Sequence, residues 1–328
     1  MLRLSFTALA VAGACGAALA QSPSVKPPQA QAWIDVATYS GMGMPGMGAG
    51  GNPMSALGVL FGGGSGGAKN TFGQTQTGSA GRWVDVTLMT RANPSLSEAQ
   101  QAVPAGFLSP ALKLQAPKEV RTPAPRDDDD KVVEQDYERP KGKLLLYWGC
   151  GATVRPGQPK VLDMATASAA DMAKFFVSRR ATQRGAHSAV GRPVWPSPVD
   201  TRMVPDNASL VGEHAFTGSG VPEGFRFQIR PEVDFMPAIA LQRGPLPSGA
   251  TLLRWGAVGP ARAYFISTMG GKSGRDDAAE MVMWSSSELP DTGFALHDYL
   301  SPGGIERLLK DKVLLAPDIL ECAMPAGV

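Results

Sequence analysis

Four methionines near the start of the chain have the spacing of ligands for a soft metal ion. Met42, Met44, Met47 and Met54 stand at Met-x-Met and Met-x-x-Met spacing, with the fourth a little further on. Thioether sulfur is a soft donor, and Cu(I) is the ion that such donors select. The pattern therefore makes a Cu(I) site one hypothesis for this segment.

The methionine group resembles the methionine-rich copper motifs of periplasmic metal-handling proteins over residues 42–54. The resemblance implies that these four side chains bind Cu(I). The surrounding segment contains neither His nor Cys to complete such a site, and glycine dominates it. A low-complexity segment without a metal is therefore the competing interpretation, and we expect no cofactor unless Cu(I) binds here.

The cysteines allow a simple pairing hypothesis. Cys150 and Cys322 are the two that remain if residues 1–20 are removed. Paired cysteines persist as disulfides in oxidising compartments, so we predict a Cys150–Cys322 bond, with two buried free thiols as the alternative. The bond would close a loop of about 170 residues and stabilise the folded chain by on the order of 4–5 kcal/mol.

The first twenty residues predict export. Arg3 gives a positive start, residues 4–19 carry no charge, and Ala18 and Ala20 are the small residues that a signal peptidase requires. We expect cleavage after Ala20 and a periplasmic or secreted protein. No later stretch is apolar and long enough to span a membrane. Retention of the apolar run as an anchor and lipidation at Cys15 are the alternatives.

No pattern in the chain is specific for catalysis. His187, His214 and His297 lie far apart, without the spacing of a metal or catalytic motif. The run Ser285-Ser286-Ser287 lacks the flanking glycines of a nucleophile elbow. Trp195 lies between two prolines and could stack on a sugar, with core packing as the competing interpretation. We expect no enzyme, although a hydrolase assembled from distant loops stays open.

Two similar segments predict neighbouring strands. Residues 32–39 and 82–89 share Trp-x-Asp-Val and alternate as half-buried strands do. Ile34 and Val36 share one face of the first segment, and Val84 and Val86 share the matching face of the second. Between them, residues 41–81 are rich in Gly and Ser, which predicts a mobile loop. We expect this loop to dock an envelope protein partner and its deletion to leave folding intact.

Further along the chain, the patterns predict short elements and one linker. Residues 96–103 are predicted to form one or two helical turns, residues 165–182 a helix and residues 302–312 a short helix. Residues 117–142 are proline-rich and then charged, which predicts a solvated linker. Strands are predicted at residues 143–151, 161–164, 225–230, 251–255, 263–267, 281–285 and 314–324.

Residues 253–264 resemble the B–C strand region of fibronectin type III domains, where a Trp ends one strand and a Tyr opens the next. The resemblance implies a β-sandwich with Trp255 and Tyr264 in its core. With 39 Gly and 28 Pro, the chain is predicted to be mainly β and sandwich-like with one or two short helices, or otherwise α+β. The predicted order is a signal peptide (1–20), a flexible N-terminus (21–31), a β-rich domain (32–200) and a sandwich-like domain (201–328).

These observations favour a class of protein and no specific role. The formal net charge of +2 indicates no strong attraction to nucleic acid or anionic lipid. We expect a non-enzymatic envelope protein that binds a partner or ligand through exposed loops, or that has a structural role. Cu(I) binding and hydrolysis are the alternatives.

Overall fold

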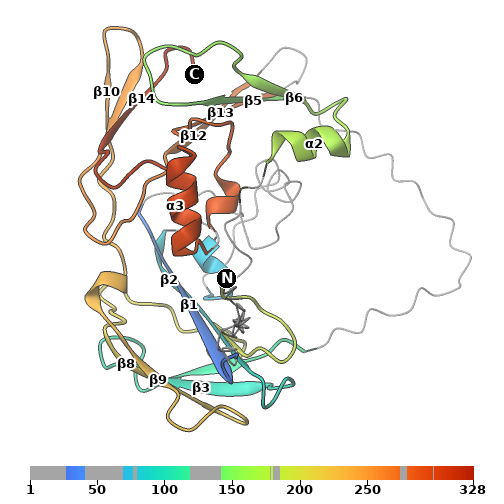
Figure 1. Ribbon diagram of the computed structural model, residues 1–328, viewed down its shortest axis with the longest axis vertical. Helices are drawn as coiled ribbons and strands as arrows, with labels where there is room; N and C mark the ends of the chain where they lie inside the picture. The colour runs from blue at the N-terminus through green and yellow to red at the C-terminus, as the bar shows by residue number, and fades with distance from the viewer. Residues whose placement is uncertain are drawn as a thin grey trace, which may run out of the picture.

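The computed structural model describes residues 27–40, 69–76, 80–118, 142–177, 179, 185–273, 279–297 and 299–328. Strands make up 36% and helices 11% of these described residues, so the prediction of a mainly β protein is confirmed. The strands form three sheets. Figure 1 shows the largest sheet in the lower half of the view and the two smaller sheets in the upper half.

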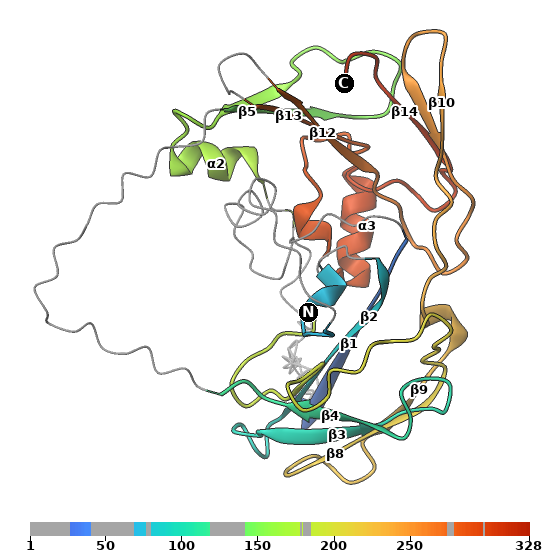
Figure 2. The ribbon, with the colours of Figure 1, turned by 180° about the vertical axis from the view of Figure 1, so that it is seen from behind.

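The largest sheet has seven strands, and it curls into a half-barrel. Every pairing within it is antiparallel. Figure 2 shows it from behind, with β3, β4 and β8 at the bottom and β1 and β2 rising from them. From one edge to the other, the order is β1 (Ala30–Tyr39), β2 (Gly81–Thr90), β7 (Val194–Trp195), β4 (Ala111–Gln115), β3 (Glu98–Ala102), β8 (Gly212–Gly218) and β9 (Arg226–Ile229).

The two Trp-x-Asp-Val segments pair as neighbours, as predicted. Ile34 lies opposite Val86 and Val36 opposite Val84, so the apolar side chains of both strands share the inner face of the curl. That face forms the main core together with Leu88, Leu112 and Trp195, all fully buried. The alternation of apolar side chains along each strand therefore decides which face of the sheet is covered.

The other face of β1 and β2 holds a pair of aspartates. Asp35 lies directly opposite Asp85. The Asp85 carboxylate accepts hydrogen bonds from the Gly73 N–H (2.8 Å), the Thr75 N–H (3.1 Å) and the Thr75 hydroxyl (2.5 Å). These bonds fasten a short 3-10 turn, η1 (Gln74–Gln76), to the sheet. Residues 69–76 are thus part of the packed fold and differ from the mobile loop predicted over 41–81, since a buried carboxylate holds their backbone.

Replacing Asp85 with Asn is expected to lower the free energy of unfolding by about 1–3 kcal/mol, because one oxygen cannot accept all three hydrogen bonds. Burial raises the pKa of the Asp85 carboxyl, and the three donors act against that rise. Urea unfolding measures the loss, and amide exchange at Gly73 and Thr75 localises it. Asp206→Asn, at an exposed aspartate, is the control. An equal effect of both variants would contradict the role of Asp85.

The segment predicted to form helical turns at residues 96–103 is strand β3, and that prediction was wrong. Its side chains alternate strictly, with Ala99 and Gln101 buried and Glu98 and Gln100 exposed. Glu, Ala and Gln favour helices when nothing else acts on them. Here β4 and β8 pair with the segment from both sides, and this pairing outweighs local preference.

Of the two smaller sheets, one combines strands from both halves of the chain and the other takes its strands from the second half alone. One is mixed and contains β12 (Ser267–Ser273), β13 (Ala279–Ser285), β5 (Gly142–Trp148) and β6 (Lys160–Asp163), with β13 and β5 parallel. The other contains β10 (Gln242–Pro245), β11 (Thr251–Arg254) and β14 (Glu321–Met324). Strand β5 pairs with β13, and β3 pairs with β8, so strands before residue 200 are hydrogen-bonded to strands after it. The predicted division of the chain into domains at residue 200 stays a prediction.

Two short helices complete the fold. Helix α2 (Ala169–Phe175) begins at a capping box formed by Ser168 and Asp171 and buries Phe175. It is shorter than the helix predicted at residues 165–182. Helix α3 (Pro302–Lys310) confirms its prediction and lies between the upper sheets and β1–β2 in both ribbon views. Neither these helices nor any other in the described ranges has the length and apolar character needed to cross a membrane.

A disulfide joins the two smaller sheets. Cys150, just after β5, is bonded to Cys322 in β14, with 5.3 Å between their Cα atoms, which confirms the predicted pair. Trp255 and Tyr264 pack in the same cluster with ring centroids 5.6 Å apart, so both are core residues as the fibronectin resemblance implied. The covalent bond therefore lies in the hydrophobic cluster that the two sheets share.

Candidate functional site

Most of the side chains that the sequence singled out have structural roles. Trp195 is 0% exposed and packs edge-on against Phe107, so the hypothesis that it stacks on a sugar was wrong. Met42, Met44, Met47 and Met54 lie outside the described residues, as do residues 1–20. The Cu(I) site, the signal peptide and most of the docking loop at 41–81 therefore stay predictions.

The serine run after β13 has its hydroxyls committed to backbone contacts. Ser285 donates to the Asp291 carbonyl (2.7 Å), while the Ser286 and Ser287 hydroxyls accept the N–H groups of Ile266 and Leu289. All three side chains are buried. A nucleophilic serine needs an exposed hydroxyl next to a base, so this run stabilises loops instead.

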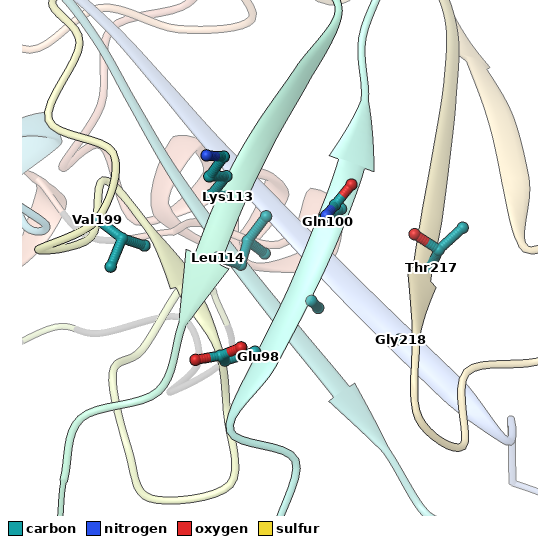
Figure 3. A pocket seen from close by; sticks show the side chains of 8 residues that line it. Glu98, Gln100, Lys113, Leu114, Val199, Thr217 and Gly218 are labelled. Carbon is teal, nitrogen blue, oxygen red and sulfur yellow. The ribbon is translucent and has the colours of Figure 1, made fainter.

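One open groove lies on the outer face of the large sheet, over β3, β4 and β8, and has a volume of about 510 Å³. Figure 3 shows Lys113, Gln100 and Thr217 in a row across the three strands, with Glu98 further along β3. We call this the polar groove. Its side chains are those of an ordinary hydrated sheet surface, and a ligand there would mainly exchange hydrogen bonds with water for hydrogen bonds with protein.

A second groove lies where the half-barrel is open, and it is apolar. Its volume is about 290 Å³, and we call it the seam groove. One wall is the inner face of β1, the first strand of the sheet, and the other comes from β9, the last strand, and the turns around it. The lining side chains are Ala32, Ile34, Val36, Phe225, Phe227, Ile229 and Val233. The two ends of the sheet therefore face each other across a hydrophobic gap.

Both strands beside this gap have an unpaired edge. Among the described strands, β1 pairs with β2 alone and β9 with β8 alone. An unpaired edge presents backbone N–H and C=O groups that are ready to bind another strand, and proteins usually protect such edges with Lys or Pro. The ten residues of β1 contain no Lys, Arg or Pro. The edge of β1 therefore lacks those protective residues.

Several exposed apolar residues follow the groove residues in the sequence. After β9, a 3-10 turn, η2 (Pro231–Val233), exposes 64% of Val233. Met236, Ile239 and Leu241 are also among the exposed large apolar residues. Four exposed apolar residues within nine positions, the first of which lines the groove, favour an interaction surface in this part of the chain.

A buried histidine packs against Phe227, one of the residues in the β9 wall of the seam groove. The His214 ring stacks on Phe227 with centroids 5.6 Å apart and planes 6° from parallel. Its Nε2 lies 2.7 Å from the Leu210 carbonyl oxygen and its Nδ1 2.9 Å from the Gln101 side-chain nitrogen. Because a carbonyl only accepts, Nε2 carries the proton and Nδ1 accepts from the amide. The ring is neutral, and burial lowers the pKa of His214 below its ordinary value of 6.5.

His214 is expected to make the protein less stable in mild acid. The unfolded chain binds a proton near pH 6.5 while the buried ring stays neutral, so the free energy of unfolding falls as the pH drops below that value. The slope is at most about 1.4 kcal/mol per pH unit. Urea unfolding at pH 7, 6 and 5 should show a steeper loss for the wild type than for His214→Gln. Parallel curves would contradict the assignment. His297, whose pKa is also lowered, is present in both proteins and cancels.

No family model, curated protein or solved structure matches this chain. The candidate site therefore rests on the geometry of the chain alone. The sequence predicted the strands at 32–39 and 225–230 and the apolar face of the first, but not the groove between them. The alternation of Phe225, Phe227 and Ile229 was the available signal, although it did not show which strand would end the sheet.

Proposed function

We propose that this chain is a non-enzymatic binding protein of an oxidising, extracytoplasmic compartment, and that it binds apolar parts of its partners in the seam groove. The observation that carries the proposal is the apolar gap between β1 and β9, lined from both sides and flanked by unpaired edges. Ligand sites are typically concave and lined mostly by hydrophobic and aromatic side chains.

The compartment is supported by two independent features. The Cys150–Cys322 disulfide persists where thiols are not kept reduced. The first twenty residues have the charge and apolar pattern of a cleavable signal peptide, which favours the periplasm or secretion.

The seam groove is expected to bind a neutral apolar fluorophore such as N-phenyl-1-naphthylamine, and Val233→Asp is expected to weaken that binding at least tenfold. The variant places a carboxylate on the groove wall, and burying it beside an apolar ligand costs more than the 1.4 kcal/mol that a factor of ten requires. Val233 is exposed, so the change should leave folding intact. Fluorescence titration gives the Kd of each variant.

Val190→Asp is the matched control, because Val190 is 59% exposed and lies outside the groove. Equal binding by the wild type and both variants would place the fluorophore elsewhere, and absence of binding to the wild type would remove the proposed site.

A further inference from the structure

We infer that the seam groove accepts an extended segment of another protein as an eighth strand, antiparallel to both β1 and β9, with apolar side chains at alternate positions. The inference rests on the proposed function and names the class of ligand that the site takes. It follows from strand directions, unpaired edges, side-chain spacing and charge.

The strand directions leave a place for one added strand. Seven strands joined by antiparallel pairings alternate in direction, so the first and last, β1 and β9, point the same way. Direct pairing of β1 with β9 would introduce a parallel pair into an antiparallel sheet, which is slightly less stable per residue. One inserted strand, running opposite to both, keeps every neighbouring pair antiparallel.

The interior is already suited to a sheet of eight strands. An eight-stranded barrel has an interior just wide enough for side chains to fill it. The inner face of the large sheet carries one continuous core that includes Leu88, Leu112, Phe216 and Trp195. The space left is the seam groove itself, which is bounded by the two unpaired edges. The added strand needs only to cover this remaining gap.

The spacing of groove residues sets the pattern of the segment. Ala32, Ile34 and Val36 are every second residue of β1, and together they span about 13–14 Å at about 3.4 Å per residue. A neighbouring antiparallel strand directs every second side chain to the same face. The segment therefore presents about three apolar residues at positions i, i+2 and i+4, while its backbone pairs with the edge of β1. This is recognition by strand addition, in which backbone hydrogen bonds give affinity and alternate side chains give specificity.

The intervening side chains of the segment face outward, beside one exposed arginine in β9 and a second directly after it. Arg226 and Arg230 are exposed and alternate with the inward Phe227 and Ile229. Glu213 approaches Arg226 only to 4.0 Å, with both side chains more than half exposed, so little of that charge is neutralised. On β1, the outward Asp35 already accepts the Ala186 N–H. Acidic residues at the outward positions near β9 therefore complement the surface.

The test uses three synthetic peptides and calorimetric titration against the full chain. The first alternates Val with Glu and Thr, the second has the same composition with its Val residues consecutive, and the third is the first with N-methyl groups at alternate backbone nitrogens. Strand addition predicts that the first peptide binds and that both others bind at least tenfold more weakly. N-methylation removes edge hydrogen bonds and leaves the side chains unchanged. Equal binding of the methylated peptide would overturn strand addition.

Charge recognition is tested separately with Arg226→Gln/Arg230→Gln and with Arg243→Gln, a control at an exposed arginine of β10. The double variant is expected to bind the acidic alternating peptide several-fold more weakly and to bind an alternating Val-Thr peptide as the wild type does. A change of the same size in the control would remove the role assigned to Arg226 and Arg230.

The remaining outcomes separate this inference from the proposed function. If the fluorophore binds the wild type and is lost in Val233→Asp, but the alternating peptide neither binds nor displaces it, groove binding stands and strand addition is overturned. If neither the fluorophore nor the peptide binds, both groove binding and strand addition are overturned. A dimer in light scattering that the alternating peptide dissociates would assign the edge to a second copy. If the peptide binds only after deletion of residues 41–68, the edge of β1 would be assigned to a segment of this same chain. Either result overturns the inference of a segment from another protein.

Discussion

Replacing both cysteines with alanine, as Cys150→Ala/Cys322→Ala, is expected to lower the free energy of unfolding by about 5 kcal/mol. The disulfide joins residues 172 apart in sequence. In the chain-entropy model, a loop of that length removes about 17 cal/mol/K from the unfolded state, which is about 5 kcal/mol at 25 °C. The bond lies among buried Trp255, Tyr264 and Trp284. Without it, β14 is held to the segment after β5 by packing and by backbone hydrogen bonds such as that from the Gly151 N–H to the Ala323 carbonyl (2.9 Å).

Guanidinium unfolding of the oxidised wild type, the reduced wild type and the alanine variant measures this effect. Reductant should shift the midpoint of the wild type towards that of the variant and leave the variant unchanged. Alanine is the suitable replacement because Cys322 is buried and a serine hydroxyl there would need a partner. Identical midpoints for all three samples would mean that the bond contributes nothing. The support that it gives to an oxidising compartment would then be lost.

The sequence predicts elements well where local pattern and tertiary pairing agree. Residues 32–39 and 82–89 alternate clearly enough to reveal both strands and their shared inner face, and the structure pairs Ile34 with Val86. Helix α3 was also foreseen, and Ser301 caps its first turn through Gly304. In these segments the local signal, a cap or a matching strand pattern, agrees with the contacts that the element makes.

The predictions fail where a partner comes from far along the chain. Gln101 is buried in β3 because it pairs with His214, 113 residues later, and nothing near residue 101 reveals that partner. Asp85 likewise holds residues 73–75 through backbone N–H groups, which any sequence provides. A carboxylate in a strand pattern therefore gives no sign of the turn that it stabilises.

The seam groove depends on sheet order, and sheet order is the least local property of the fold. The groove requires β1 and β9 to be the two ends of the sheet, which follows from β7 joining β2 to β4. Strand β7 has only two residues and is flanked by prolines, so it has no strand pattern from which it could be predicted. The composition of β1, free of Lys, Arg and Pro, is a local feature consistent with an edge that binds.

Gly191→Ala is expected to lower the free energy of unfolding by about 2–5 kcal/mol, because Gly191 brings the chain into β7 through a contact that has no room for a side chain. A Cβ at this position would lie 1.9 Å from the Pro94 carbonyl oxygen, and the residue has φ of +74°. The unfavourable φ accounts for about 1–2 kcal/mol, and displacing backbone against backbone adds a further 1–3 kcal/mol.

Gly157→Ala separates these two contributions, because Gly157 has φ of +83° with nothing within 4 Å of the added Cβ. The control should lose only the 1–2 kcal/mol that belongs to the dihedral angle. Urea unfolding of both variants measures the loss of stability. Titration with the apolar fluorophore then tests whether the same contact affects binding in the seam groove. If the approach of Gly191 to Pro94 positions β7, the Gly191 variant should bind the fluorophore more weakly under conditions where it remains folded, whereas the Gly157 variant should bind as the wild type does. Equal losses of stability in the two variants would show that the backbone at Pro94 moves aside with little loss of free energy. The curl of the sheet would then not depend on this contact.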